Sequence, residues 1–562
     1  MPLRYQNHIT SLVDSRIMEP DSLQNYNIPE RLQHWAKIHP NSEAFVFVDK
    51  DGLRTSLTCK EILDQSVYFA RQLRKLGIQP GEVICSLLPD SPHGFIVFFG
   101  TILAGCVILN GKLQLKDGSY LIENINKTKS PLLILSSDPK DECRKLFSEL
   151  IDNGDGTKVS SKTLPFIKHV LYTEVNRSIG FKWTNQLLEN DDTEDDVICY
   201  DGNADALLML SSGTTGMPKM MVHSHLLMKY FMEPVQPKCR NGMLNSYSLT
   251  WIPGLLYHYL STGLKSVYID QRNPPLIPSI GQFLYDLLSQ EKCDLLSIEF
   301  TVLMNFFKVI ENKGKPNDWP EHIECILLGR PLSSAIVDRC LSHCDVVYNL
   351  YGAEETTNNT CKSISKNTPY EDFNTGVALA GVEIIIRDKN NVPVPPGTIG
   401  NIYVKTKGLL KRYFGDEKLT NDAFDSDGFF NMNDAGYFNK DDELIVFGRT
   451  KDVIVRGEDY FHPTWIEQVI RRCPEVQDVM VVKVPDVMFD QEICACVVLV
   501  PGSKYSVEQI EEFCKNSFVP TDLDNVPACP RYFILMDKIP VNRNRKPDRM
   551  ATEKYAKHYL NL

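Results

Sequence analysis

Long apolar runs and blocks of basic residues are both missing from this sequence. No stretch approaches the about 18 consecutive apolar residues that a membrane-spanning helix requires, so no transmembrane segment is predicted. The formal net charge is −12 and no lysine- or arginine-rich block stands out, which makes nucleic acid a poor candidate partner. The surface is instead expected to be acidic and solvated.

Closely paired cysteines are also missing. The sequence has 16 cysteines but no Cys-x-x-Cys pair, and its nearest approaches are Cys494-x-Cys496 and the spacing from Cys340 to Cys344. Scattered cysteines in a long chain without a secretory signal are mostly reduced core residues. We therefore expect neither a zinc site nor a disulfide framework.

Targeting signals are weak at both ends of the sequence. The first residues lack the apolar core of a secretory signal, and Arg4 and Arg16 are offset by Asp14 and Glu19, which makes a mitochondrial presequence weak. The terminal Leu-Asn-Leu is not a convincing peroxisomal tripeptide. The expected location is cytoplasmic, with mitochondrial and peroxisomal locations left open.

Length and composition are those of a well-cored protein. The 562 residues correspond to about three or four domains or subdomains. A hydrophobic content of 43% with 23% charged residues is ordinary for a globular chain. The first part alternates predicted strands and helices, which is typical of parallel α/β units. The expected elements are a helix over 30–38, a strand over 44–48, a helix after the capping box at Thr58 and Glu61, a strand over 83–88, a helix over 95–104, and strands over 106–109, 132–135 and 170–172.

The stretch from Leu207 to Lys219 carries the strongest functional signal. It begins as a short apolar run and turns abruptly into hydroxyls, glycines and one lysine, which predicts a buried strand ending in a phosphate loop. Hydroxyls donate hydrogen bonds, glycines let backbone N–H groups approach anionic oxygens, and lysine adds a positive charge. The spacing differs from Gly-x-x-x-x-Gly-Lys-Ser/Thr, which argues against a P-loop NTPase. The predicted phosphate-binding residues are Ser212, Gly213, Thr214, Thr215, Gly216 and Lys219.

Ser-Ser-Gly-Thr-Thr-Gly-Met-Pro-Lys, residues 211–219, resembles the phosphate-loop signature of the adenylate-forming superfamily. This superfamily comprises acyl-CoA synthetases, standalone adenylation domains and beetle luciferases, and the resemblance spans roughly residues 30–550. It implies an α/β fold in which a large N-terminal domain, residues 1–450, combines parallel α/β subdomains with a small β subdomain. Short predicted strands place that β subdomain at about 376–448. A mobile α+β C-terminal domain, residues 451–562, is expected to follow a hinge.

Further motifs follow in the superfamily's order. Tyr351-Gly-Ala-Glu-Glu355 is similar to Tyr-Gly-x-Thr-Glu, which implies that Tyr351 stacks on adenine, that Gly352 keeps the motif's register and that Glu355 holds Mg²⁺ together with Thr215. Gly329 resembles the glycine of a turn beside the adenine.

The last motifs lie around the hinge and near the C-terminus. By the same resemblance Asp434 accepts the ribose hydroxyls, Arg449 contacts the nucleotide, and Lys451 is the hinge position. Lys546 matches the lysine that reaches into the active site, so Lys546 and Glu355 are the expected catalytic residues.

Several positions depart from the superfamily's pattern. Glu354 places a carboxylate where relatives have a threonine that meets the α-phosphate, and two like charges about 4 Å apart repel by about 4 kcal/mol at an effective dielectric constant of about 20. Glu354 could turn away, be protonated or weaken nucleotide binding. The other departures are Leu328, Arg330, Asn401, Asn542 and Arg545.

Two further features stay open at this level. His225 matches a histidine that opens a helix in the superfamily, and we expect a helix-capping role for the pair of His223 and His225 rather than metal binding, because no third ligand is nearby. The aromatic residues between Tyr247 and Tyr259 fit an acyl-pocket lining and plain core packing equally well.

The function implied by the resemblance is that of an AMP-forming acid–thiol ligase. A hydrophobic carboxylate, expected to be a fatty acid, would be activated with ATP and Mg²⁺ as an acyl-adenylate and transferred to coenzyme A. Amino-acid activation is less expected because no aspartate lies between Tyr247 and Tyr259. A luciferase-like or standalone adenylating enzyme remains an alternative. The departures above favour a second alternative, a catalytically impaired nucleotide- or acyl-binding relative.

Overall fold

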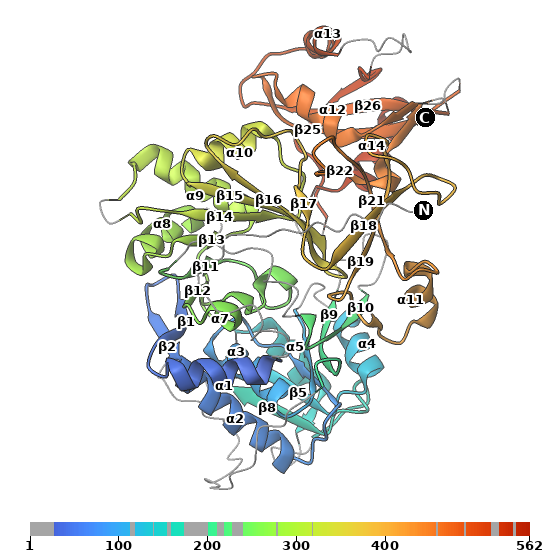
Figure 1. Cartoon of the computed structure of the whole chain (residues 1–562). Coiled ribbons are helices and arrows are strands. Elements are labelled where there is room, and N and C mark those ends of the chain that lie inside the picture. Colours follow the sequence, from blue (N-terminus) through green and yellow to red (C-terminus); the bar gives the residue numbers. More distant parts are fainter. Residues whose placement is uncertain are drawn as a thin grey trace.

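Two large sheets, a small β subdomain and a small C-terminal domain make up the molecule (Figure 1). This arrangement confirms the predicted fold class. No helix in the described part of the chain is long and apolar enough to cross a bilayer. The computed structural model describes residues 27–112, 118–138, 140–153, 159–173, 201–210, 219–227, 240–276, 279–316, 319–456, 459–487, 490–518, 528–542 and 547–562.

The first large sheet has seven strands in the order β20-β10-β9-β4-β3-β5-β8. Its central strands are parallel, whereas β10 runs antiparallel to both of its neighbours, β9 and β20. The predicted strand–helix–strand unit is present as β3, α3 and β4. The strand bounds are β3 Val83–Ser86, β4 Val107–Asn110, β5 Leu132–Ser136, β8 His169–Thr173, β9 Asp205–Leu210, β10 Met220–Ser224 and β20 Arg412–Tyr413.

The second large sheet has nine strands in the order β17-β16-β15-β14-β13-β11-β12-β1-β2. The strands from β15 to β1 in this order are parallel, so their carboxyl ends share one edge. The bounds are β1 Glu43–Val48, β2 Arg54–Thr58, β11 Met243–Asn245, β12 Ser266–Ile269, β13 Leu295–Ser297, β14 Glu324–Leu328, β15 Val346–Ala353, β16 Thr357–Ser365 and β17 Val377–Ala378.

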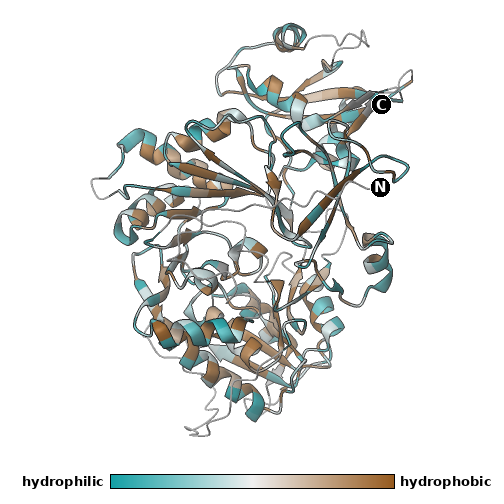
Figure 2. Ribbon diagram, in the orientation of Figure 1, coloured by the Kyte–Doolittle hydropathy of each residue, from teal (hydrophilic) through white to brown (hydrophobic). Residues whose placement is uncertain are grey.

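Helices separate the two sheets and cover their outer faces. Successive side chains of strand β1 point to opposite faces of the sheet and enter two different cores. Phe45 and Phe47 pack with the helices between the two sheets, whereas Val46 and Val48 pack in the core on the outer face. Apolar residues line the strands and the inward helix faces, and polar residues the outside (Figure 2). The helix bounds are α1 Ile28–Ile38, α2 Cys59–Lys75, α3 Pro92–Leu103, α4 Ser119–Thr128, α5 Glu142–Leu150, η2 Ile252–Gly254, α7 Tyr257–Thr262, α8 Ile280–Glu291, α9 Phe300–Lys313 and α10 Ser334–Leu341.

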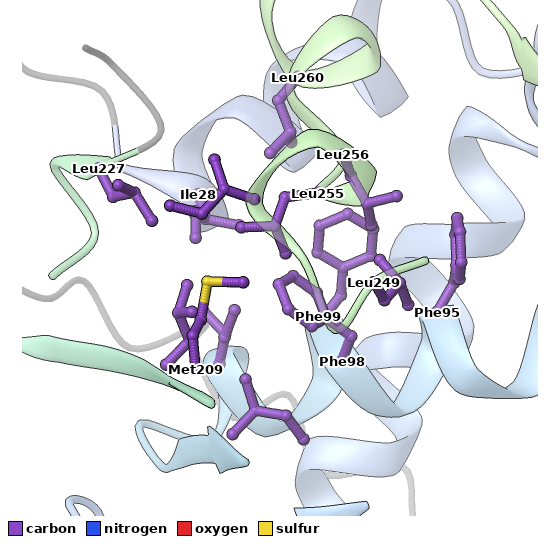
Figure 3. Close-up of a cluster of buried hydrophobic side chains, with 14 of the residues drawn as sticks. Ile28, Phe95, Phe98, Phe99, Met209, Leu227, Leu249, Leu255, Leu256 and Leu260 are labelled. Atoms are coloured by element: carbon purple, nitrogen blue, oxygen red, sulfur yellow. The ribbon is translucent and has the colours of Figure 1, made fainter. Parts of the chain in front are cut away.

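The core between the sheets includes part of the segment whose role the sequence left open. Tyr259 is fully buried and its ring lies 4.7 Å from that of Phe45. Leu255, Leu256 and Leu260 point into the same apolar cluster as residues of α3 and β9 (Figure 3). Most of this segment is therefore core packing.

The β subdomain and the C-terminal domain complete the fold. The subdomain sheet has the order β18-β19-β21-β22, and the C-terminal sheet the order β25-β26-β27. Trp465 of the first C-terminal helix is 40% exposed and packs edge-to-face on Phe518. The bounds are β18 Val382–Arg387, β19 Gly400–Thr406, α11 Glu417–Ala423, β21 Phe430–Phe438, β22 Leu444–Arg449, η4 Thr450–Asp452, β23 Ile454–Arg456, β24 Asp459–Phe461, α12 Pro463–Arg471, β25 Val476–Asp486, β26 Asp490–Leu499, α13 Val507–Ser517, β27 Tyr532–Leu535 and α14 Arg549–Leu560; a short pair, β6 Asp152–Asn153 and β7 Val159–Ser160, lies apart.

Candidate nucleotide site

Tyr351, Asp434 and Arg449 meet where β15 approaches β21 and β22. The Tyr351 hydroxyl donates to Oδ2 of Asp434 at 2.8 Å, although the two residues are 83 positions apart. Asp434 and Arg449 are cross-strand partners, which brings Arg449 Nε within 3.5 Å of Asp434 Oδ1. Arg449 Nη1 also donates to the main-chain oxygen of Met432 at 3.0 Å. The residues expected to contact adenine, ribose and phosphate are thus brought together.

Burial sets the protonation of this group. Asp434 is 8% exposed, and burial raises the pKa of its carboxyl, whereas Arg449 and the Tyr351 hydroxyl lower it. Burial and the charge of Asp434 both raise the pKa of the Tyr351 hydroxyl well above its usual value. The phenol therefore keeps its proton and donates. Asp434 has further lone pairs with which to accept ribose hydroxyls.

A second tyrosine contacts the predicted magnesium ligand. The Tyr413 hydroxyl donates to Oε1 of Glu355 at 3.1 Å. The ammonium of Lys219, the last residue of the predicted phosphate loop, lies 5.3 Å from the centroid of the Tyr413 ring. Tyr413 thus touches two predicted site residues from different sheets.

Residues 410–414 join the two large sheets at this point. The main-chain N–H of Leu410 donates to the main-chain oxygen of Glu355 at 2.7 Å, and that of Lys411 donates to Val222 at 2.8 Å. Lys411 and Arg412 both form ion pairs at 2.6 Å with Asp205, at the start of β9. The segment therefore holds the Glu355 turn against the strand that follows the phosphate loop.

Gly352 allows the Glu355 turn to close tightly. Residues 354–356 form the turn between β15 and β16, and the register shifts at Gly352. A Cβ atom at Gly352 would lie 1.8 Å from the main-chain oxygen of Thr357. The predicted glycine is thus needed because two main-chain segments approach closely.

The structure corrects the expectation for His223. Residues 220–224 form β10, antiparallel to β9, so His223 lies inside a strand and does not cap a helix. Its ring is fully buried, and burial lowers its pKa to about 4 although a contact with the backbone of Glu354 raises it. His223 is therefore neutral beneath the turn that carries Glu354 and Glu355. His225 follows β10 and is also buried.

The expected adenine side is bordered by Gly329 and Arg330. Gly329 directly follows β14 and has a left-handed conformation with φ of 82°, as its predicted turn requires. The Arg330 guanidinium lies 4.0 Å from the ring centroid of Phe300, in a cation–π contact. Burial lowers the pKa of Arg330, and its charged neighbours include Arg471 and Asp478 of the C-terminal domain.

The expected hinge has specific contacts on both sides. The main-chain oxygen of Lys451 accepts from Nζ of Lys483 at 2.8 Å, and Thr450 donates to Asn401 at 3.0 Å. Arg549 forms a 2.7 Å ion pair with Glu467 and a 3.7 Å ion pair with Asp452. Arg549 therefore links the hinge to helix α12.

Several predicted site residues lie outside the described part of the chain. These are Ser212, Gly213, Thr214, Thr215, Gly216 and Lys546. Their predicted roles remain predictions.

The described residues fit a magnesium ion that is shared with a nucleotide. No group of three or more His, Cys, Asp or Glu side chains in the described ranges is arranged to hold a metal by itself. Mg²⁺ at phosphate sites needs only one or two carboxylates, because phosphate oxygens and water complete its shell. Glu355 is half-buried, and its Oε1 accepts from the Tyr413 hydroxyl at 3.1 Å. A carboxylate held in this way still has lone pairs with which to bind a cation.

Comparison with known proteins places this geometry in context. Residues 32–414 match the model of the AMP-binding enzyme family, and residues 465–546 match that of the AMP-binding enzyme C-terminal domain. The chain is 23% identical to the mitochondrial medium-chain acyl-CoA ligase ACSF2 of Danio rerio, covering 96% of this chain and 88% of the relative. It is 25% identical to the 2-succinylbenzoate–CoA ligase of Bacillus licheniformis, covering 92% and 98%.

The fold agrees with solved structures as well. The anthranilate CoA ligase AuaEII, crystallised with anthranoyl-AMP, superposes with a TM-score of 0.78 at 18% identity, covering 97% of this chain and 100% of that chain. The order of the motifs, the fold and the family match agree. The chain therefore belongs to the AMP-binding enzyme family of ATP-dependent, adenylate-forming ligases.

Proposed function

We propose that this protein is an AMP-forming acid–thiol ligase that activates a hydrophobic carboxylate, of the fatty-acid class, and transfers the acyl group to coenzyme A. The observation that carries the proposal is the convergence of five predicted residues on one strand and turn. Tyr351 contacts Asp434, which also forms an ion pair with Arg449. Four positions later in the chain, Glu355 accepts a hydrogen bond from Tyr413, whose ring also contacts Lys219. One end of this segment suits a ribose and the other a metal-bound phosphate.

The chemistry requires a leaving group. A carboxylate is a poor acyl donor because oxide leaves badly, and attack of the carboxylate on the α-phosphorus of ATP gives an acyl-adenylate and pyrophosphate. The thiol of coenzyme A then displaces AMP. Such a site works by aligning and neutralising phosphates and supplies no protein nucleophile.

We assign the roles as follows. One carboxylate oxygen of Asp434 accepts the ribose hydroxyls, while the other accepts from the Tyr351 hydroxyl. Arg449 neutralises the charge of Asp434 and reaches the nucleotide. Lys219, with Ser212, Gly213, Thr214, Thr215 and Gly216, holds the pyrophosphate oxygens. Mg²⁺, held by Glu355 and Thr215, would neutralise phosphate charge. Lys546 stabilises charge during adenylation, and rotation about Lys451 exchanges Lys546 for the thiol path.

The fatty-acid class is supported by a relative. The medium-chain acyl-CoA ligase of Danio rerio matches 96% of this chain. The succinylbenzoate and anthranilate ligases make an aromatic acid the natural competitor.

ATP–pyrophosphate exchange with a panel of acids tests the proposal. The panel runs from acetate through medium- and long-chain fatty acids to aromatic acids. We expect exchange that depends on fatty acids and collapses in Lys546→Ala, whereas the control Lys538→Ala, an exposed lysine of the same domain, retains it. Exchange with aromatic acids alone would refute the substrate class. ATP binding without exchange for any acid would refute the ligase.

A second candidate, an impaired nucleotide-binding relative, is favoured by Glu354. Glu354 directly precedes Glu355 in the turn that is expected to meet the α-phosphate. Glu354→Thr separates the two functions. A large gain in exchange would mean that the natural site is impaired, and a loss would mean that Glu354 contributes to an active site.

A further inference from the structure

We propose that Tyr413 is a positioning residue that orients the predicted magnesium ligand Glu355 and the phosphate-loop lysine Lys219 with one side chain. This inference rests on the proposed function of the site. Tyr413 lies outside every motif by which the sequence indicated nucleotide binding, and 58 positions separate it from Glu355.

The two ends of the Tyr413 side chain have different tasks. Its hydroxyl donates to Oε1 of Glu355 at 3.1 Å, which fixes the carboxylate and would leave its other oxygen to hold Mg²⁺. Its ring faces the ammonium of Lys219 at 5.3 Å, and a cation over an aromatic face is attracted to the negative centre of the ring. A single side chain therefore sets the distance between one anionic and one cationic group of the site.

The environment keeps Tyr413 in its donor form. The residue is 4% exposed, and burial together with the charge of Glu355 raises the pKa of its hydroxyl. A phenol that stays protonated can only donate to a carboxylate, so the direction of this hydrogen bond is defined at all moderate pH values.

The backbone around Tyr413 is held on several sides. Tyr413 pairs with Met221 where β20 contacts β10, and Met221 follows Lys219 by two residues in the chain. Its N–H donates to the Thr420 hydroxyl at 3.0 Å. The ion pairs of Lys411 and Arg412 with Asp205 hold the preceding residues on β9. A ring anchored in this way can impose an orientation on its partners.

Tyr413→Phe tests the hydroxyl, because phenylalanine keeps the ring beneath Lys219. The matched control is Tyr403→Phe: Tyr403 accepts a hydrogen bond from Asn431 at 3.3 Å and lies 5.0 Å from the Arg387 guanidinium, away from the site. The first readout is Mn²⁺ binding to the protein saturated with α,β-methylene-ATP, followed by electron paramagnetic resonance. The second is the Mg²⁺ and ATP dependence of pyrophosphate exchange.

We expect Tyr413→Phe to weaken Mn²⁺ binding by about ten-fold, the effect of losing a hydrogen bond to a charged group. The KM for Mg·ATP should rise while the KM for the carboxylate stays constant. Tyr413→Leu should also weaken binding of the nucleotide without metal, because Lys219 loses the ring. In a Glu355→Gln background, Tyr413→Phe should have little further effect on Mn²⁺.

The outcomes distinguish the inference from the function on which it rests. Equal Mn²⁺ affinities for Tyr413→Phe and Tyr403→Phe, in a folded protein whose wild type is active, would overturn the role of Tyr413 alone. A full effect of Tyr413→Phe in the Glu355→Gln background would overturn the assigned route through Glu355. A wild-type chain that binds neither metal nor nucleotide would overturn both the proposed function and this inference.

Discussion

Replacing Gly352 by alanine should damage the candidate site more than it damages the fold. The new Cβ atom would lie 1.8 Å from the main-chain oxygen of Thr357 and 2.8 Å from its carbonyl carbon. Cβ contacts below 3.0 Å are essentially never found, so the main chain of β15 and β16 must separate by about 1.2 Å, the difference between 3.0 and 1.8 Å. Neither obstacle is a flexible side chain.

The separation falls between the two ends of the site. Tyr351 precedes Gly352 and Glu355 follows it, so this displacement alters the spacing of the proposed ribose and metal contacts. A misplacement of about 1 Å in an aligned site can lower a rate by about 100-fold. Overpacking of this kind costs about 1–3 kcal/mol of folding free energy. We expect a drop of about 100-fold in kcat/KM for ATP in the exchange assay, with a modest fall in Tm.

Gly381→Ala is the matched control. Gly381 has φ of 76° and open space around its Cα, so alanine there costs about 1–2 kcal/mol through backbone strain without touching the site. Thermal unfolding and pyrophosphate exchange should be measured on both variants. If Gly352→Ala keeps exchange within about two-fold of wild type, or if Gly381→Ala loses as much activity, the close approach of the Gly352 and Thr357 main chains is not what the site requires.

Three further predictions concern Asp434, Arg549 and His258. Asp434→Asn should raise the KM for ATP about ten-fold and leave the KM for the carboxylate unchanged, because the proposed ribose acceptor loses its charge; equal changes in both constants would count against a ribose role. Arg549→Met should lower the free energy of unfolding by about 1.5–3 kcal/mol, because it removes the shorter ion pair of Glu467, 4% exposed, and leaves this carboxylate with Arg471 at 3.9 Å; urea denaturation measures this, and a loss below about 1 kcal/mol would contradict it. Burial lowers the pKa of His258 from 6.5 to about 4, so the unfolded chain takes up a proton at a higher pH than the folded chain does. The free energy of unfolding should therefore fall by about 2 kcal/mol between pH 7.5 and 5 because of this residue. His258→Leu should remove that share of the loss, and an unchanged dependence of stability on pH would argue against a neutral buried histidine.

Local chemistry made much of the fold predictable. The capping box of Thr58 and Glu61 begins α2 as expected, and an analogous box of Asn27 and Glu30 begins α1 two residues before the predicted start. The apolar runs around 83–109 form the parallel pair β3 and β4. These elements depend on interactions within a few residues, which a periodic pattern records directly.

Local reasoning was wrong, or left two alternatives open, where a distant segment decided the structure. His223 was expected to cap a helix, but β9 and β20 flank residues 220–224 and make them a strand. The segment containing Tyr259 could have lined a pocket, but Phe45, far away in sequence, packs against it and makes it core. Backbone pairing and burial by remote segments outweigh local preference.

The sequence by itself determined the family, the fold class and the identity of the motif residues, because each motif is a short run of consecutive side chains. Only the tertiary structure decided that Tyr351 donates to Asp434 and that Tyr413 joins Glu355 to Lys219. The two hydrogen bonds connect residues 58 and 83 positions apart, the contact of Tyr413 with Lys219 spans a still longer separation, and no periodicity or spacing rule relates these residues. They exist because the ends of several strands meet at one place, and packing of the whole domain determines which side chains touch there.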